Sequence, residues 1–122
     1  MSDLFNKRIN ELRKILKNSD EAVLLTNEVN IGYFSNFYHS EGYMVVTQRN
    51  SYLLVDFRYF ESAQKNAENC EVVLFNKLSD ELIKILSSEN IKNIYFETAY
   101  ITLSKFKWFK NIFSNNNIEC ID

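Results

Sequence analysis

With 122 residues, 46% of them hydrophobic and 15% aromatic, the chain has enough apolar surface for one packed core and falls within the usual size of a single domain. Fourteen Lys and Arg residues against sixteen Asp and Glu residues give a formal net charge of −2, and the basic residues are scattered, which argues against a nucleic-acid partner. No apolar run approaches the roughly 20 residues of a membrane span, and the N-terminus lacks the apolar core of a signal peptide, so we expect no membrane partner.

The first predicted elements are a helix, a buried strand and a second short helix. The opening segment repeats its apolar residues at helical spacing, with Ser2 or Asp3 as its cap and Asn18 as a left-handed stop. Residues 22–26 are apolar on both faces, which is typical of a buried strand. One or two helical turns are expected over 27–34.

A loop over 36–42 leads into a predicted β-hairpin. Its strands are expected over 43–48 and 52–56, on either side of a short polar turn. Asp56, directly after the second strand, has the position of a helix N-cap.

Strands and helices alternate over the rest of the chain. We predict a strand at 70–75, a helix capped by Ser79 that runs to Leu86, a strand at 91–96, a helix at 102–113 and a last strand at 118–121. Alternation with one hairpin predicts an α/β fold: a single three-layer domain over residues 1–122, with a mixed, mostly parallel sheet, one central hairpin and helices on both faces.

The two cysteines bear on the compartment. Cys70 and Cys120 lie in separate strand-like runs, without a CxxC pair. This usage favours buried thiols in a reducing compartment, so we expect a cytoplasmic protein.

The loop with the chain's sole histidine is the first candidate for chemistry. His39, Ser40 and Glu41 are consecutive, and consecutive loop residues rarely converge on one reacting atom, so a catalytic triad is disfavoured. One histidine and two distant cysteines cannot supply a zinc site, and no converging carboxylates suggest a magnesium or manganese site. We therefore expect no catalytic or metal-binding residues in this chain.

Arg58 is the second candidate. It falls in the first turn of the helix that Asp56 caps, where a cation is unfavourable unless a carboxylate holds it. It is therefore either one half of a structural ion pair, with Glu41 as a possible partner, or a cation that faces a ligand.

Two stretches then resemble a known family. Residues 30–43 read NIGYFSNFYHSEGY and residues 54–60 read LVDFRYF. They are similar to the creatinase/prolidase N-terminal domain, whose pattern runs roughly N-I-x-Y-L-T-G-F-x-G-S-E-G-Y and, after a hairpin, D-G-R-Y. The family's usual glycines stand here as Asn36, His39 and Phe57; Asn36 can keep the turn because asparagine tolerates a positive φ.

The resemblance implies a ribonuclease-H-like domain that precedes the catalytic domain of an Xaa-Pro aminopeptidase or dipeptidase. It implies two divalent metal ions (Mn, Co or Zn) held by that catalytic domain and none here. It also implies a homodimer, in which Tyr38, His39, Glu41 and Arg58 gate the partner's active site and contact short proline-containing peptides. On this reading the chain supports a hydrolase without being one itself.

Three interpretations stay open. The chain is the non-catalytic N-terminal domain of an Xaa-Pro peptidase, or of a creatinase-like amidinohydrolase that uses no metal, or it is a free-standing module that binds a protein or peptide.

Overall fold

The computed structural model describes residues 2–38, 42–96 and 101–121, in which helices and strands alternate around one central hairpin. The helices are α1 (Ser2–Arg13), α2 (Glu28–Ser35), α3 (Phe57–Asn66), α4 (Leu78–Ser88) and α5 (Leu103–Ser114). The strands are β1 (Glu21–Leu25), β2 (Tyr43–Thr47), β3 (Ser51–Val55), β4 (Glu71–Leu74), β5 (Asn93–Phe96) and β6 (Glu119–Ile121).

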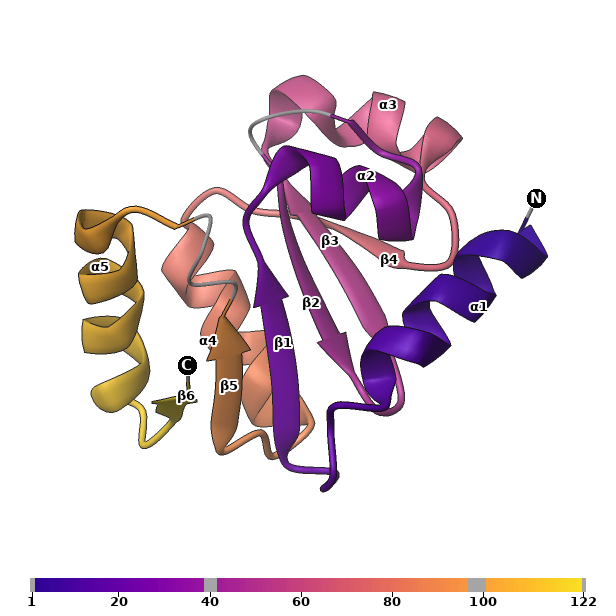
Figure 1. Cartoon of the computed structure of the whole chain (residues 1–122). Coiled ribbons are helices and arrows are strands. Elements are labelled where there is room, and N and C mark those ends of the chain that lie inside the picture. The colour runs from indigo at the N-terminus through magenta and orange to yellow at the C-terminus, as the bar shows by residue number, and fades with distance from the viewer. Residues whose placement is uncertain (1, 39–41, 97–100, 122) are drawn as a thin grey trace.

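The strands form one sheet in the order β4-β3-β2-β1-β5-β6 (Figure 1). Only β2 runs against its neighbours, pairing antiparallel with β1 and β3, while the β3–β4, β1–β5 and β5–β6 pairs are parallel. Parallel neighbours need a crossover connection, and α3 and α5 supply two of them. The predicted mixed, mostly parallel sheet with a central hairpin is confirmed.

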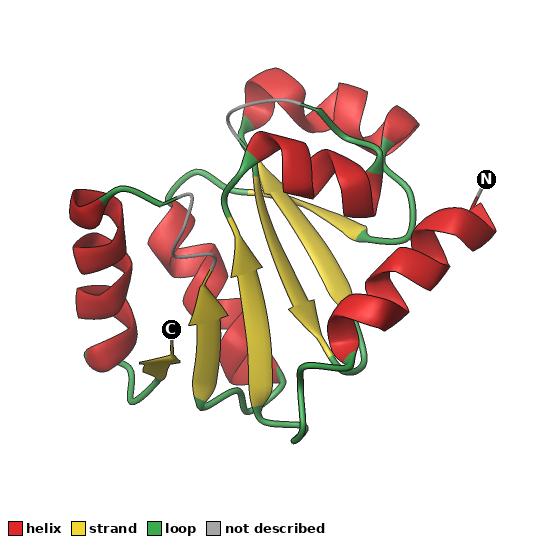
Figure 2. Cartoon of the chain, in the orientation of Figure 1, coloured by secondary structure: helices red, strands yellow, loops and turns green. Residues whose placement is uncertain are grey.

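Helices cover both faces of the sheet and give three layers (Figure 2). Along β1, Ala22 and Leu24 face a core shared with α4 and α5, whereas Val23 and Leu25 face a core shared with α1, α2 and α3. Successive side chains of a strand point to opposite faces, so a strand buried on both must be apolar throughout. This is why the run from residue 22 was readable as a buried strand.

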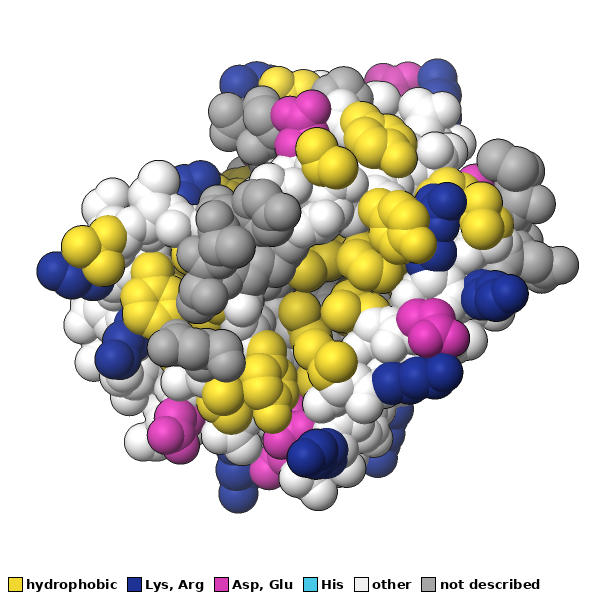
Figure 3. All heavy atoms as spheres, viewed as in Figure 1, with side chains coloured by type: hydrophobic (Ala, Val, Ile, Leu, Met, Phe, Trp, Pro, Cys, Tyr) yellow, Lys and Arg dark blue, Asp and Glu magenta, His cyan; other side chains and the backbone are white. Residues whose placement is uncertain are grey.

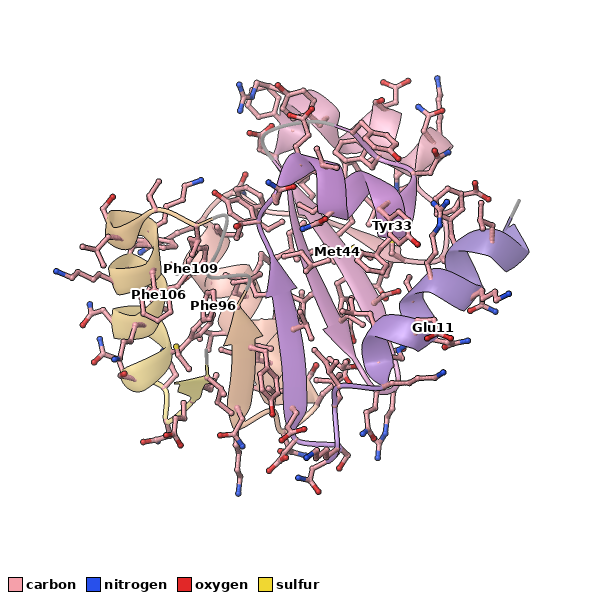
Figure 4. All side chains as sticks on the ribbon, viewed as in Figure 1. Glu11, Tyr33, Met44, Phe96, Phe106 and Phe109 are labelled. Atoms are coloured by element: carbon pink, nitrogen blue, oxygen red, sulfur yellow. The ribbon has the colours of Figure 1, made fainter. Side chains whose placement is uncertain are left out.

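Aromatic rings fill the space between β5 and α5. The rings of Phe106, Phe109 and Phe113 have centroids 5.3, 5.8 and 6.0 Å from that of Phe96. Figure 4 shows Phe106 and Phe109 near Phe96. Tilted and edge-to-face arrangements at such distances are favourable for aromatic pairs. This cluster attaches α5 to the sheet.

Two predicted helix ends were wrong. Asn18 is not left-handed; α1 ends at Arg13, and the N–H groups of residues 17 and 18 donate to the Glu21 carboxylate instead. Ser79 is not a cap either, because α4 begins at Leu78 with no side-chain cap. Acidic residues in the first turn of α4 supply the favourable charge at its N-terminus.

Glu89 holds the turn of the β2–β3 hairpin against the end of α4. Its carboxylate accepts hydrogen bonds from Thr47 Oγ1 at 2.7 Å, Asn50 Nδ2 at 3.1 Å and the Tyr52 hydroxyl. Burial raises the pKa of Tyr52, and the bond to Glu89 raises it further. Three donors on one acceptor fix the hairpin at the end of β2 opposite to Tyr43.

Candidate functional site

The candidate residues lie at the end of the sheet where the parallel strands finish. Strands β1, β3, β4 and β5 finish there, and the antiparallel β2 begins there (Figure 1). The register pairs Tyr43 with Leu54, so Gly42, just before β2, lies beside Val55, just before α3. In open α/β sheets, ligands bind outside the carboxyl ends of the strands. This end of the sheet is therefore the candidate site.

Helix α2 positions the first part of the loop. Its N-cap is Asn27, whose side chain accepts from the N–H of Asn30 at 3.1 Å, and its C-cap is Asn36, whose φ of 63° is left-handed. The left-handed turn predicted for Asn36 is confirmed. Phe37 then inserts into the core, where it is 1% exposed. The chain thus leaves α2 in a fixed direction.

Tyr38 lies against the backbone of Gly32. A Cβ atom at Gly32 would stand 2.1 Å from both Cδ1 and Cε1 of the tyrosine ring, so the ring occupies the space that any other residue's side chain would need. The ring is nevertheless 54% exposed. The absence of a side chain at Gly32 therefore lets the exposed Tyr38 ring pack there, at the candidate site. The sequence did not predict this role of Gly32, because it depends on a contact between α2 and the residues after it.

Asp56 and Arg58 form a local ion pair at the start of α3. Asp56 Oδ1 accepts from the backbone N–H of Arg58 at 3.0 Å, which confirms Asp56 as the N-cap. Arg58 Nη2 lies 2.6 Å from Asp56 Oδ2. Hydrogen bonds from the Arg58 side chain are the main cause that lowers the pKa of Asp56. The pairing favours the ionised form of the carboxylate and offsets the unfavourable position of a cation at the helix start.

The structure shows Asp56 as one partner of Arg58, and the pairing with Glu41 that the sequence suggested stays a prediction. Glu41 and His39 both lie outside the described residues. Arg58 keeps 52% of its side chain exposed in spite of the pair. Beside it, Phe57 is 79% exposed, although sequence reasoning named Phe57 only as a departure from the family's glycine.

At this end of the sheet, the described residues thus combine the exposed rings of Tyr38 and Phe57 with the half-exposed guanidinium of Arg58, which is paired with Asp56. Such a combination suits contacts to a peptide, with apolar side chains on the rings and a carboxylate near the guanidinium. Within residues 2–38, 42–96 and 101–121, no three His, Cys, Asp or Glu side chains gather closely enough to hold a metal ion. In the same ranges, no helix is long and apolar enough to cross a membrane.

Comparison with known proteins gives consistent matches. The family model described as the creatinase/prolidase N-terminal domain matches residues 8–122. A Mycoplasma genitalium protein named as an Xaa-Pro aminopeptidase is 31% identical over 110 residues, which are 87% of this chain and 30% of that protein. An Xaa-Pro dipeptidase from Bacillus anthracis has a TM-score of 0.85 at 28% identity, over 96% of this chain and 33% of that one.

A solved Xaa-Pro aminopeptidase chain from Streptococcus pyogenes has a TM-score of 0.87 at 21% identity, which shows likeness of fold alone. The match covers 99% of this chain and 92% of that one. The chain therefore spans about a third of the length of the first two relatives and nearly the whole of this third one.

Proposed function

Since the chain belongs to the creatinase/prolidase N-terminal domain family, we propose that it is the non-catalytic N-terminal domain of a metal-dependent Xaa-Pro peptidase. The observation that carries the proposal is the family match over residues 8–122, together with relatives of about three times the length that are named as Xaa-Pro peptidases. In this proposal residues 1–122 are one domain of the creatinase/prolidase N-terminal type.

The accompanying catalytic domain hydrolyses the bond before proline and holds two divalent metal ions (Mn, Co or Zn). The described residues of this chain do not fit such a metal pair, because they offer no cluster of ligating side chains. The complete protein is a homodimer in the cytoplasm, and the two cysteines of this chain, which form no CxxC pair, are in line with a reducing compartment. The domain's own contribution is then to association and to the shape of the active-site entrance.

The gating residues are Tyr38, His39, Glu41 and Arg58. Tyr38 presents an apolar face to the substrate side chain or the proline ring, supported from below by Gly32. Arg58, held by Asp56, attracts the carboxylate end of a short peptide. His39 donates a hydrogen bond to that carboxylate or to a substrate carbonyl, and Glu41 attracts the free amino end.

The first experiment compares residues 1–122 with the full product of the reading frame that encodes them. Both are purified and assayed with Mn²⁺ on Xaa-Pro dipeptides and Xaa-Pro-Xaa tripeptides. We expect turnover by the longer protein and none by residues 1–122. A product no longer than this chain, or a longer product that hydrolyses creatine without metal, overturns the proposal in favour of a free-standing module or an amidinohydrolase domain.

The second experiment tests gating in the longer protein. We expect Tyr38→Ala and His39→Ala each to raise KM with little change in kcat, because lost contacts of uniform strength appear mainly in KM. Loss of one well-formed hydrogen bond to the substrate carboxylate corresponds to about 1.5 to 3 kcal/mol. The matched control is Leu103→Ala on α5, a side chain that is 68% exposed. Unchanged kinetics in both loop variants would remove gating from the proposal and leave the domain a structural role.

A further inference from the structure

A pocket opens at the same end of the sheet as the candidate site, on the face that α4 and α5 cover. It encloses about 300 Å³ and is lined by Tyr43, Leu78, Ser104, Lys105, Trp108 and Phe109. These residues come from the starts of β2 and α4 and from the first half of α5; β2 begins at this end, and α4 and α5 follow β4 and β5, which finish there. In open α/β sheets, ligands bind outside the carboxyl ends of the strands, so the pocket lies where a ligand is expected.

Aromatic rings form the walls of the pocket. The ring of Phe109, which is 1% exposed, has its centroid 5.0 Å from that of Trp108 and 6.0 Å from that of Tyr43, and both contacts are edge-to-face. Figure 4 shows Phe109 on the side of α5 that faces the sheet. Trp108 stays 47% exposed, so it presents ring surface to solvent beside a fixed neighbour. A ligand would meet rings that are already in place, which lowers the entropic cost of binding.

Lys105 brings a positive charge to these rings. Among the described residues that line the pocket, it is the only charged one. Its ammonium nitrogen lies 5.6 Å from the centre of the Tyr43 ring, a cation–π distance that keeps the cation at the pocket. Within the described ranges, Lys105 forms no ion pair with a carboxylate. Figure 3 shows hydrophobic and basic side chains side by side over α5.

The described polar groups near Lys105 leave its charge uncompensated. Ser104 Oγ lies 3.5 Å from Thr102 Oγ1, a long contact, so the exposed Ser104 hydroxyl can also donate to a ligand. The acidic residues in the first turn of α4, Asp80 and Glu81, line two other depressions of the surface. An ammonium group and a hydroxyl beside an apolar pocket match a carboxylate that is attached to an apolar group.

We propose that this pocket binds the carboxyl end of a peptide whose last side chain is apolar. The side chain lies between Trp108 and Tyr43, and the carboxylate accepts from the Lys105 ammonium group and the Ser104 hydroxyl. Ligand pockets enclose about 300–1,000 Å³, so a pocket at the lower limit suits one residue rather than a long ligand. The choice of a peptide over another apolar carboxylate rests on the proposed function, in which peptides are the substrates.

The test uses Trp108, the only tryptophan of the chain, as a reporter inside the pocket. The 122-residue chain is titrated with acetyl-alanyl-leucine and with the amide of the same peptide while tryptophan emission is recorded. We expect a saturable change with the acid at a Kd of about 1 mM. The amide should bind about threefold to fivefold more weakly, because it lacks the charge that an exposed ammonium group attracts.

One variant and one matched control assign this selectivity to Lys105. Lys105→Gln keeps most of the length of the side chain and removes its charge, so acid and amide should bind alike. Lys107→Gln removes a charge from the same helix outside the lining of the pocket and should leave the difference unchanged. Both lysines are exposed, so both variants should melt at the temperature of the original chain.

An emission that does not change up to about 20 mM peptide overturns the proposal. Equal binding of acid and amide by the original chain, or selectivity that survives Lys105→Gln, does so too. Hexanoate has the charge and an apolar chain without a peptide group, and tighter binding of hexanoate than of the peptide would overturn the assignment to peptides. The titration needs no turnover, so its failure leaves the proposed function standing, and a longer protein without peptidase activity would overturn the proposed function alone.

Discussion

At the scale of single residues, Gly32 decides where Tyr38 lies. In Gly32→Ala the new methyl group would overlap the tyrosine ring, whose atoms lie 2.1 Å from the Cβ position. Because the ring is half exposed, the ring should move rather than α2. Alanine also favours a helix over glycine by about 0.5–1 kcal/mol, so we expect the free energy of unfolding to change by less than about 1 kcal/mol.

The displaced ring is the measurable effect of Gly32→Ala. Proton NMR should show the Tyr38 ring resonances shifting, with the core resonances unchanged. Gly42→Ala is the matched control, because its Cβ would meet nothing nearer than Phe37 Cε2 at 3.5 Å. A stable Gly32→Ala protein with an unmoved Tyr38 would contradict this account of the loop.

Glu21 makes the fold sensitive to acid. Its buried carboxylate accepts from the N–H of Lys17 at 2.7 Å and from the N–H of Asn18 at 3.2 Å, and the bond from Lys17 is the main cause that lowers the pKa of Glu21 from its ordinary value of 4.5. A carboxyl group whose pKa is lower in the folded state stabilises the fold above the unfolded pKa, and this contribution is lost as the pH falls through the folded pKa.

The variant Glu21→Gln keeps the shape and loses the charge. We expect it to be less stable than the original chain at about pH 7, and the difference should shrink as the pH falls below about 4.5. Urea unfolding at a series of pH values measures this, with Glu61→Gln on the exposed face of α3 as control. A difference that does not vary with pH would show that the charge of Glu21 is unimportant.

At the scale of elements, the β2–β3 hairpin depends on Glu89. In Glu89→Ala, Asn50 Nδ2 and the buried Tyr52 hydroxyl lose this acceptor, whereas Thr47 Oγ1 keeps the carbonyl of Asn50 at 3.2 Å. An unsatisfied buried polar group costs about 1–3 kcal/mol, so we expect a loss of that size in the free energy of unfolding. The pKa of Tyr52 should fall as well, because Glu89 raises it.

Chemical denaturation and ultraviolet titration of the tyrosines measure the two effects of Glu89→Ala. Glu119→Ala, exposed on the edge strand β6, serves as the control. If the hairpin variant unfolds at the same urea concentration as the original chain, the three bonds are not needed to hold the turn.

The elements also show what sequence could predict. Strands buried on both faces were found because their composition is set by both cores, and Asn36 was found because its left-handed turn is a local property. Asn18 was misjudged because its N–H group donates to Glu21 instead, and Ser79 because α4 starts without a side-chain cap, with acidic residues in its first turn. The contact of Tyr38 with Gly32 and the Asp56–Arg58 ion pair depend on where side chains lie in space, which the sequence alone does not predict.

At the scale of the whole molecule, the chain should fold without metal. We expect calorimetric titration of residues 1–122 with Mn²⁺ or Zn²⁺ to show no site of micromolar affinity, and EDTA to leave Tm unchanged. The described residues give no cluster of ligands, and a metal held tightly by the folded state alone would raise Tm. Stoichiometric tight binding would show that His39 or Glu41, with other side chains, forms a site.

The single antiparallel strand also sets an order of assembly. Strands β1, β2 and β3 are consecutive and pair as neighbours, whereas β1 pairs with β5 through residues 21–24 and 93–96, which lie far apart in the sequence. Closing a long loop has an entropic cost before its contacts form, so local pairings come first. A growing polypeptide can therefore complete the β1–β2–β3 meander while β5 and β6 are still being synthesised. Pulse-labelling hydrogen exchange should find the amides of β2 protected before those of β6, and simultaneous protection would mean that the sheet forms in one concerted step.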